Sequence, residues 1–134
     1  MKIIICDSND NIMDTMKSYT DLEQSKKLAE ILPLESADMY WWSSGKRYYI
    51  EAMDDGDFNE REGNVRAWSL AALLNVLPDT ITSNDGIAFK LNIKKNIIEY
   101  SNPPLYLIYK SVKSDNPIDA CYEMIIKLHE QNLL

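Results

Sequence analysis

The sequence is poor in the residues that build metal and redox sites. Its 134 residues include two cysteines, Cys6 and Cys121, and one histidine, His129. Two cysteines do not make a disulfide framework, and with one histidine they are too few for an ordinary zinc site. We therefore expect both thiols to be reduced and buried, as free cysteines usually are. No metal or other cofactor is predicted.

Glycine is equally scarce, and its positions exclude several catalytic motifs. The spacing fits no phosphate-binding loop, no dinucleotide fingerprint and no nucleophile elbow. A Ser–His or Cys–His pair would have to use His129, which we expect to be a partly buried histidine near a helix end. We predict that the chain is not an enzyme, and a small enzyme without a recognisable motif is the weakest alternative. The four glycines are Gly45, Gly56, Gly63 and Gly86.

Long apolar runs are absent as well. No stretch approaches the roughly 18 apolar residues of a membrane helix. The four-residue run Ile3–Cys6 is shorter than the apolar region of a secretory signal. We therefore expect a soluble, cytoplasmic protein without a membrane partner.

What the sequence has in excess is negative charge. The formal net charge is −7, and residues 33–64 carry eight acidic and three basic side chains. An acidic surface repels phosphate backbones, so we expect no nucleic-acid partner. A calcium loop starting at Asp55 fails, because Glu60 and Arg66 occupy the positions that need Gly and Glu. The predicted acidic patch comprises Glu51, Asp54, Asp55, Asp57, Glu60 and Glu62.

The apolar pattern predicts three helices. Thr20 and Glu23 fit a capping box at the start of a helix over about 21–32. Ser69 caps a second helix over 70–77. Asn116 and Pro117 open a third helix, to about residue 131, with apolar residues at i, i+3 and i+4. Residues 1–19 contain a short strand at Lys2–Cys6 and a short amphipathic helix, or form a loosely attached extension.

Two groups of strands separate these helices. An aromatic hairpin spans residues 38–53, and alternating residues over 86–110 predict an antiparallel meander. Because the strands and helices segregate, we predict a single α+β domain over 1–134. Its helices would pack on one antiparallel sheet of about five strands.

The aromatic hairpin is the most distinctive feature. Its aromatic side chains are enough to cover both faces of two paired strands, so we interpret most of them as sheet packing. The alternative is that one face forms a protein interface, where Tyr and Trp are enriched. A small ligand is a third, weaker interpretation. The residues of this predicted interaction surface are Tyr40, Trp42, Tyr48 and Tyr49.

Three runs carry a family resemblance. They are Ser36–Trp41, Ala67–Pro78 and Asn116–Leu128, and they resemble uncharacterised small proteins of gut anaerobes and their phages and mobile elements. The resemblance covers roughly residues 20–134 and transfers no functional residue. It implies a cytoplasmic accessory protein of the kind that mobile elements carry, and favours binding over catalysis only by analogy.

Two binding hypotheses follow. The leading one is a non-enzymatic, regulatory or accessory protein that acts by protein–protein contact, with an unidentified partner or a second copy of the chain. The alternative is an acidic inhibitor or nucleic-acid mimic, of the immunity or anti-restriction type, which its acidic patch would steer onto a basic partner.

Overall fold

The computed structural model describes residues 4–6, 17–53, 58–59 and 63–134. The chain divides into two compact units, Met1–Ala72 and Leu73–Leu134. Each unit contains its own four-stranded sheet. The fold is α+β, as predicted, but two sheets replace the expected single sheet of about five strands.

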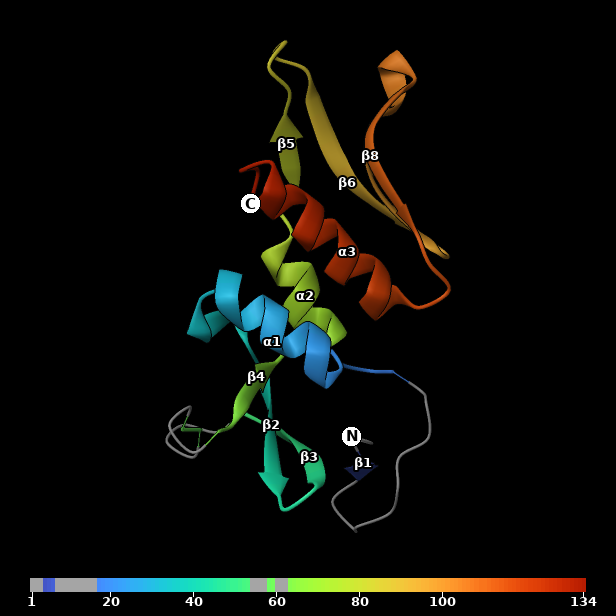
Figure 1. The fold of residues 1–134 in the computed structure, drawn as a ribbon. Helices are drawn as coiled ribbons and strands as arrows, with labels where there is room; N and C mark the ends of the chain where they lie inside the picture. The colour runs from blue at the N-terminus through green and yellow to red at the C-terminus, as the bar shows by residue number, and fades with distance from the viewer. Residues whose placement is uncertain (1–3, 7–16, 54–57, 60–62) are drawn as a thin grey trace. The chain divides into compact units, whose positions relative to one another are not determined.

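The sheet of the first unit is mixed. It is built from β1 (Ile4–Cys6), β2 (Met39–Ser44), β3 (Arg47–Ala52) and β4 (Val65–Ala67) in the order β1-β3-β2-β4 (Figure 1). β2 and β3 form the predicted antiparallel hairpin around the turn at Gly45–Lys46, and β4 is antiparallel to β2. β1 confirms the strand expected near the N-terminus and pairs parallel with β3. The short helix predicted around residues 12–19 lies mostly outside the described residues.

The helix α1 (Leu22–Ile31) has a different cap from the predicted one. The N-cap is Asp21, whose carboxylate accepts from Gln24 N at 2.8 Å. Gln24 Oε1 in turn accepts from Asp21 N at 3.2 Å, which completes a capping box one residue later than expected. At the other end, the Arg66 guanidinium donates to the carbonyls of Ala29 and Leu32 at 2.8 and 3.0 Å. These two hydrogen bonds connect β4 to the C-terminus of α1. Along the chain, α1 is followed by the short helix η1 (Leu34–Ser36) and then by β2.

Thr20 is therefore free for a different role. It is fully buried, and its hydroxyl accepts from Trp68 N at 3.1 Å and lies 2.7 Å from the Ser25 hydroxyl. Its carbonyl accepts from Trp41 Nε1 at 3.2 Å. Its own N–H donates to the Trp68 carbonyl at 2.9 Å. One threonine thus satisfies polar groups from three segments of the first unit.

The helix α2 (Leu70–Val76) contains the division between the two units. Ser69 Oγ accepts from Ala72 N at 3.2 Å, which confirms Ser69 as its capping residue. The Asp38 carboxylate accepts from both the backbone N–H and the hydroxyl of Ser69.

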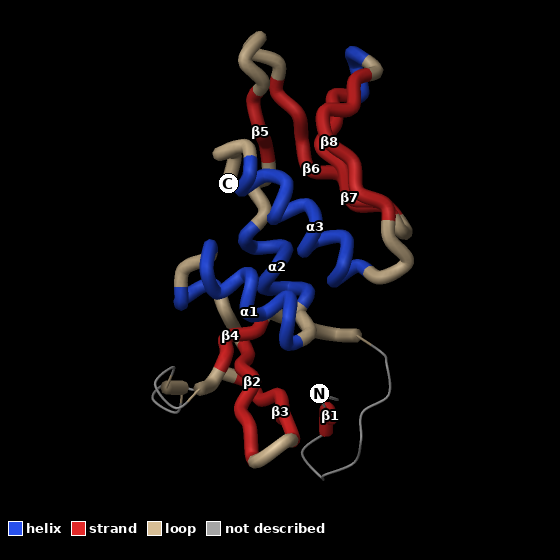
Figure 2. Tube along the Cα trace, in the orientation of Figure 1, coloured by secondary structure: helices blue, strands red, loops and turns tan. Residues whose placement is uncertain are grey.

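The second unit contains the predicted meander and one more strand. β5 (Thr80–Thr82), β6 (Ala88–Lys94), β7 (Ile97–Asn102) and β8 (Leu107–Lys113) pair antiparallel in sequence order (Figure 2). Asn102-Pro103-Pro104 ends the ladder as expected, and Pro103–Leu105 form the short helix η3. Leu105 therefore belongs to this turn and not to the strand.

The helix α3 (Pro117–Glu130) confirms the clearest sequence prediction. Asn116 Oδ1 accepts from Ile118 N and Asp119 N at 2.8 and 3.2 Å. The helix lies against β7 and β8 (Figure 2). Cys121 is buried, as expected, whereas His129 is exposed, so the prediction of a partly buried histidine was wrong. Buried apolar residues of β7, β8 and α3 are Ile98, Tyr100, Val112, Ile118, Ala120, Cys121, Met124, Ile125 and Leu128.

The strands that sequence reasoning missed are short. β4 and β5 have three residues each, and alternation over three residues is too brief to be distinguished from a loop. No helix in the described part of the chain is long and apolar enough to cross a membrane.

Candidate interaction surfaces

The aromatic hairpin is divided between two faces of the first sheet. Trp41, Tyr48 and Ile50 share one face, where Trp41 is 1% exposed and Tyr48 packs against the core. This side of the hairpin is therefore sheet packing, as the main sequence interpretation proposed. Tyr48 pairs with Ser43 and not with another aromatic residue.

The opposite face carries the other three residues of the predicted surface. Tyr40 is buried, and its hydroxyl donates to Glu51 Oε2 at 3.0 Å. Trp42 and Tyr49 are partly exposed and stack with ring centroids 4.5 Å apart and an interplanar angle of 18°. Trp42 Nε1 is buried and has no hydrogen-bond partner among the described residues. Of the four residues of the predicted surface, Trp42 and Tyr49 thus offer aromatic surface to a partner on this face.

Among the residues of the predicted acidic patch, only Glu51 belongs to the described part of the chain. Glu51 is exposed at the end of the hairpin. The other five members, Asp54, Asp55, Asp57, Glu60 and Glu62, lie outside the described residues, as does most of the loop tested for calcium. The inhibitor hypothesis therefore stays a prediction.

The described residues were also compared with the requirements of metal binding and acid–base catalysis. These residues contain no group of three or more His, Cys, Asp or Glu side chains that could hold a metal ion. Two described carboxylates are already engaged, since Asp38 is hydrogen-bonded to Ser69 and Glu51 to Tyr40.

The second unit carries an exposed apolar surface that sequence reasoning did not single out. Five consecutive large side chains follow Pro104 and remain accessible, from 38% for Tyr109 to 95% for Tyr106. Tyr106 lies in the left-handed region at φ 55° and ψ 35°, so the backbone turns sharply between η3 and β8. Figure 1 shows this turn in orange at the end of β8 farthest from the start of α3. We call this surface the apolar edge; it comprises Leu105, Tyr106, Leu107, Ile108 and Tyr109.

A bulge explains why the alternation predicted for this strand fails. Tyr100 pairs with Lys110 but Ser101 pairs with Ile108, so Tyr109 is an extra residue in β8. The Tyr109 ring stacks on Phe89, with centroids 5.0 Å apart and an interplanar angle of 28°. A pattern of simple alternation could not show an inserted residue.

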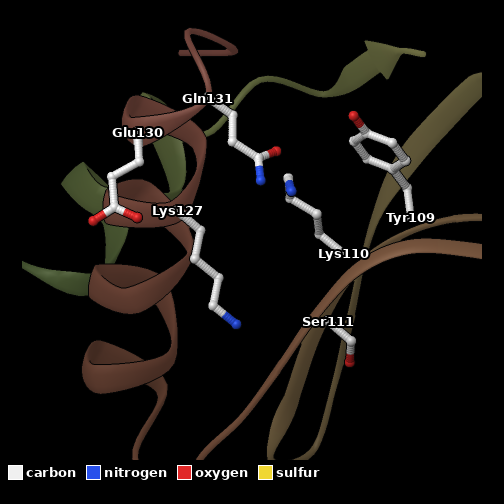
Figure 3. Close-up of a pocket in the computed structure, with 6 residues that line it drawn as sticks. All are labelled: Tyr109, Lys110, Ser111, Lys127, Glu130 and Gln131. Carbon is white, nitrogen blue, oxygen red and sulfur yellow. The ribbon is translucent and has the colours of Figure 1, made fainter. Parts of the chain in front are cut away.

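A hollow of about 360 Å³ lies beside Tyr109, between β8 and the last turns of α3 (Figure 3). In Figure 3 the Lys127 side chain points toward β8, whereas the Glu130 carboxylate points away from it. Lys110 Nζ lies 5.0 Å from the centre of the Tyr109 ring. We call this site the lysine hollow; its lining residues are Tyr109, Lys110, Ser111, Lys127, Glu130 and Gln131.

The two lysines of the hollow have no acidic partner in the part of the chain that the structure describes. The ion pairs of the described residues involve Lys17, Lys26, Lys27 and Lys94, and neither Lys110 nor Lys127 forms one with a described residue. Both ammonium groups are thus available to an anionic group of a ligand or partner.

Comparisons with known proteins give no match among protein-family models, curated proteins or solved structures. They therefore do not bear on the resemblance to proteins of gut anaerobes and mobile elements. A functional proposal has to rest on the surfaces described above.

Proposed function

We propose that this protein is a binding module that acts through protein–protein contact, and that the apolar edge is its contact surface. The observation that carries the proposal is the exposure of five consecutive large apolar and aromatic side chains, Leu105–Tyr109. Contiguous apolar surface that remains open to water typically marks a site of association.

The composition of this surface supports contact with protein. Tyr106 and Tyr109 supply large rings at low entropic cost, and aromatic residues are enriched in the cores of interfaces. The Tyr109 ring is already held by its stack on Phe89. A partner that covers it loses less side-chain entropy than it would against a freely rotating ring.

The Trp42–Tyr49 stack is the rival contact surface. It has fewer exposed aromatic side chains than were expected, because Tyr40 is buried and Tyr48 packs against the core. This comparison favours the apolar edge as the main site. Trp42→Ala therefore serves as a second test variant.

The test uses Ile108, which is 62% exposed and has little packing to lose. We expect Ile108→Lys to leave the unfolding midpoint unchanged and to weaken partner capture about tenfold, because burial of one such side chain contributes about 1–3 kcal/mol. The full chain, purified and immobilised, is used to capture proteins from cells of its source, and capture is quantified by mass spectrometry.

Leu34→Lys is the matched control, since Leu34 is 49% exposed but lies in η1 of the other unit. The proposal requires that the wild type and Leu34→Lys both capture the same partner protein and that Ile108→Lys captures less of it. Equal capture by Ile108→Lys would overturn it, and selective loss in Trp42→Ala would move the contact surface to the hairpin. Sedimentation of the same proteins tests whether the partner is a second copy.

A further inference from the structure

We infer that the partner presents an extended acidic peptide segment, which pairs along β8 and places a carboxylate side chain in the lysine hollow. This inference rests on the proposed function and specifies the chemistry of the partner. It combines three features of β8 and its surroundings: an open edge, apolar residues at the start of the strand, and two lysines, Lys110 and Lys127, that form no ion pair with the described residues.

The open edge favours an extended partner. β8 is the last strand in the order β5-β6-β7-β8, so one side of its backbone has no paired strand among the described residues. Five of its seven side chains are exposed, on both faces of the strand: Leu107, Ile108, Tyr109, Ser111 and Lys113. An added strand satisfies such an edge by main-chain hydrogen bonds, and its alternate side chains provide specificity.

The charges select an acidic segment. The chain as a whole carries a net charge of −7, yet β8 contains Lys110 and Lys113 and no acidic residue. Lys110 and Lys127 line the hollow and form no ion pair with any described residue, and the Glu130 carboxylate points away from β8 (Figure 3). If a partner strand pairs along β8, carboxylate side chains at its alternate positions would lie near Lys110 and Lys127.

The same charges disfavour a second copy. In an antiparallel pairing about the middle of β8, Lys110 would lie opposite Lys110 of the other copy, and like charges in directly opposed positions are destabilising. Lysines and a bulge on an edge strand are also devices that prevent a sheet from pairing with itself. They do not prevent pairing with a strand of opposite charge.

The test uses three synthetic peptides as probes. Each has seven residues, like β8, with valine alternating with glutamate, glutamine or lysine, and each has an acetylated N-terminus and an amidated C-terminus. They are titrated into the ¹⁵N-labelled full chain, and amide shifts are followed by NMR. We expect shifts over Leu107–Lys113 and the last turn of α3, with the glutamate peptide binding about fivefold more tightly than the glutamine peptide in low salt.

Three further arms identify the source of the effect. The preference for the glutamate peptide should disappear in about 1 M salt, because the Debye length is then only about 3 Å and the attraction between the charges is screened. The double variant Lys110→Glu/Lys127→Glu should prefer the lysine peptide, while Lys95→Glu, in the β6–β7 turn, should behave as the wild type. A glutamine peptide with a free C-terminus shows whether a terminal carboxylate can replace the glutamate side chain. If the protein binds this peptide more tightly than the glutamate peptide, the inference is overturned.

Other outcomes are also decisive. Equal binding of the glutamate and glutamine peptides at β8 would overturn the acidic partner but leave the apolar edge as a contact surface. Failure of all three peptides to shift β8 at millimolar concentration would overturn the strand-pairing inference. The capture experiment with Ile108→Lys would still decide the proposed function independently.

Discussion

At the scale of the residue, Thr20 shows how a correct residue type can be assigned the wrong role. A threonine three residues before a glutamate predicts a capping box, but the neighbouring Asp21 takes the cap. Thr20 instead lies in the core, where its side chain and backbone bond to Trp41, Trp68 and Ser25. The two residues compete for one cap position, and only the tertiary partners of Thr20 decide between them.

Cys121 leads to a prediction about alkaline stability. Burial raises the pKa of its thiol from 9.0 to about 11. Burial, reinforced by the charges of Asp79 and Cys121, also raises the pKa of the Tyr100 hydroxyl. Between about pH 9 and 11 the unfolded thiol loses its proton and the folded thiol keeps it. The contribution of Cys121 to stability is therefore complete below pH 9 and is lost as pH rises toward 11.

We expect the free energy of unfolding to fall by about 1–3 kcal/mol over this range because of Cys121. The measurement is urea denaturation, followed by circular dichroism, at several pH values. Cys121→Ala should show a shallower decline with pH, whatever its stability at pH 8, and Cys6→Ala serves as the thiol control. An identical decline in Cys121→Ala and the wild type would show that this thiol is not the group responsible.

At the scale of the element, α3 and β8 represent opposite limits of prediction from sequence. The limits of α3 follow from local chemistry, since Asn116, Pro117 and the apolar stripe all indicate the same helix. β8 was predicted as a strand, but its bulge at Tyr109 and the exposure of its first residues were not. Those features depend on pairing with β7 and on an edge that no other described strand covers, neither of which a strand encodes by itself.

The cap of α3 can be tested directly. Asn116→Ala removes the acceptor of the Ile118 and Asp119 backbone N–H groups. We expect it to destabilise the protein by about 0.5–2 kcal/mol, because those donors lose their partner at the start of the helix. Urea denaturation followed by circular dichroism gives the value.

Asn84→Ala is the matched control, because Asn84 is exposed in the turn before β6. Asn116→Asp should retain most of the stability, since a carboxylate accepts the same bonds. Equal stabilities for Asn116→Ala and Asn84→Ala would show that the cap contributes nothing measurable.

At the scale of the whole molecule, the chain divides into two compact units, whereas the pattern of its strands and helices predicted a single domain. Each unit has its own sheet and its own buried residues. Local unfolding usually follows such contiguous units. All three tryptophans, Trp41, Trp42 and Trp68, belong to Met1–Ala72. Their fluorescence therefore reports on the first unit alone.

This division predicts which amides respond to a core substitution. Leu28 and Leu128 are each fully buried, one in α1 and the other in α3. We expect Leu28→Ala to accelerate hydrogen exchange in the first unit and Leu128→Ala in the second, each by the equivalent of about 2–5 kcal/mol. Hydrogen exchange with mass spectrometry, together with tryptophan fluorescence during urea denaturation, measures both effects.

The single-domain prediction makes the opposite forecast. If either substitution accelerates exchange throughout the described residues and shifts the fluorescence transition equally, the chain unfolds as one cooperative domain. The exposed substitution Leu34→Lys should change neither unit and sets the background of the measurement.

The sequence by itself determined the features that depend on short-range chemistry. These are the α+β class, the helix limits near Asn116 and Ser69, the β2–β3 hairpin and the three-stranded meander, because caps, turns and alternation act within a few residues. Tertiary structure alone decided that there are two sheets, that Tyr40 is buried, and that Leu105–Tyr109 are exposed beside two lysines that form no ion pair with the described residues. Those outcomes depend on which strands pair and which edge is left open. Strand pairing joins residues that are far apart along the chain, so the local sequence pattern of either strand does not predict it.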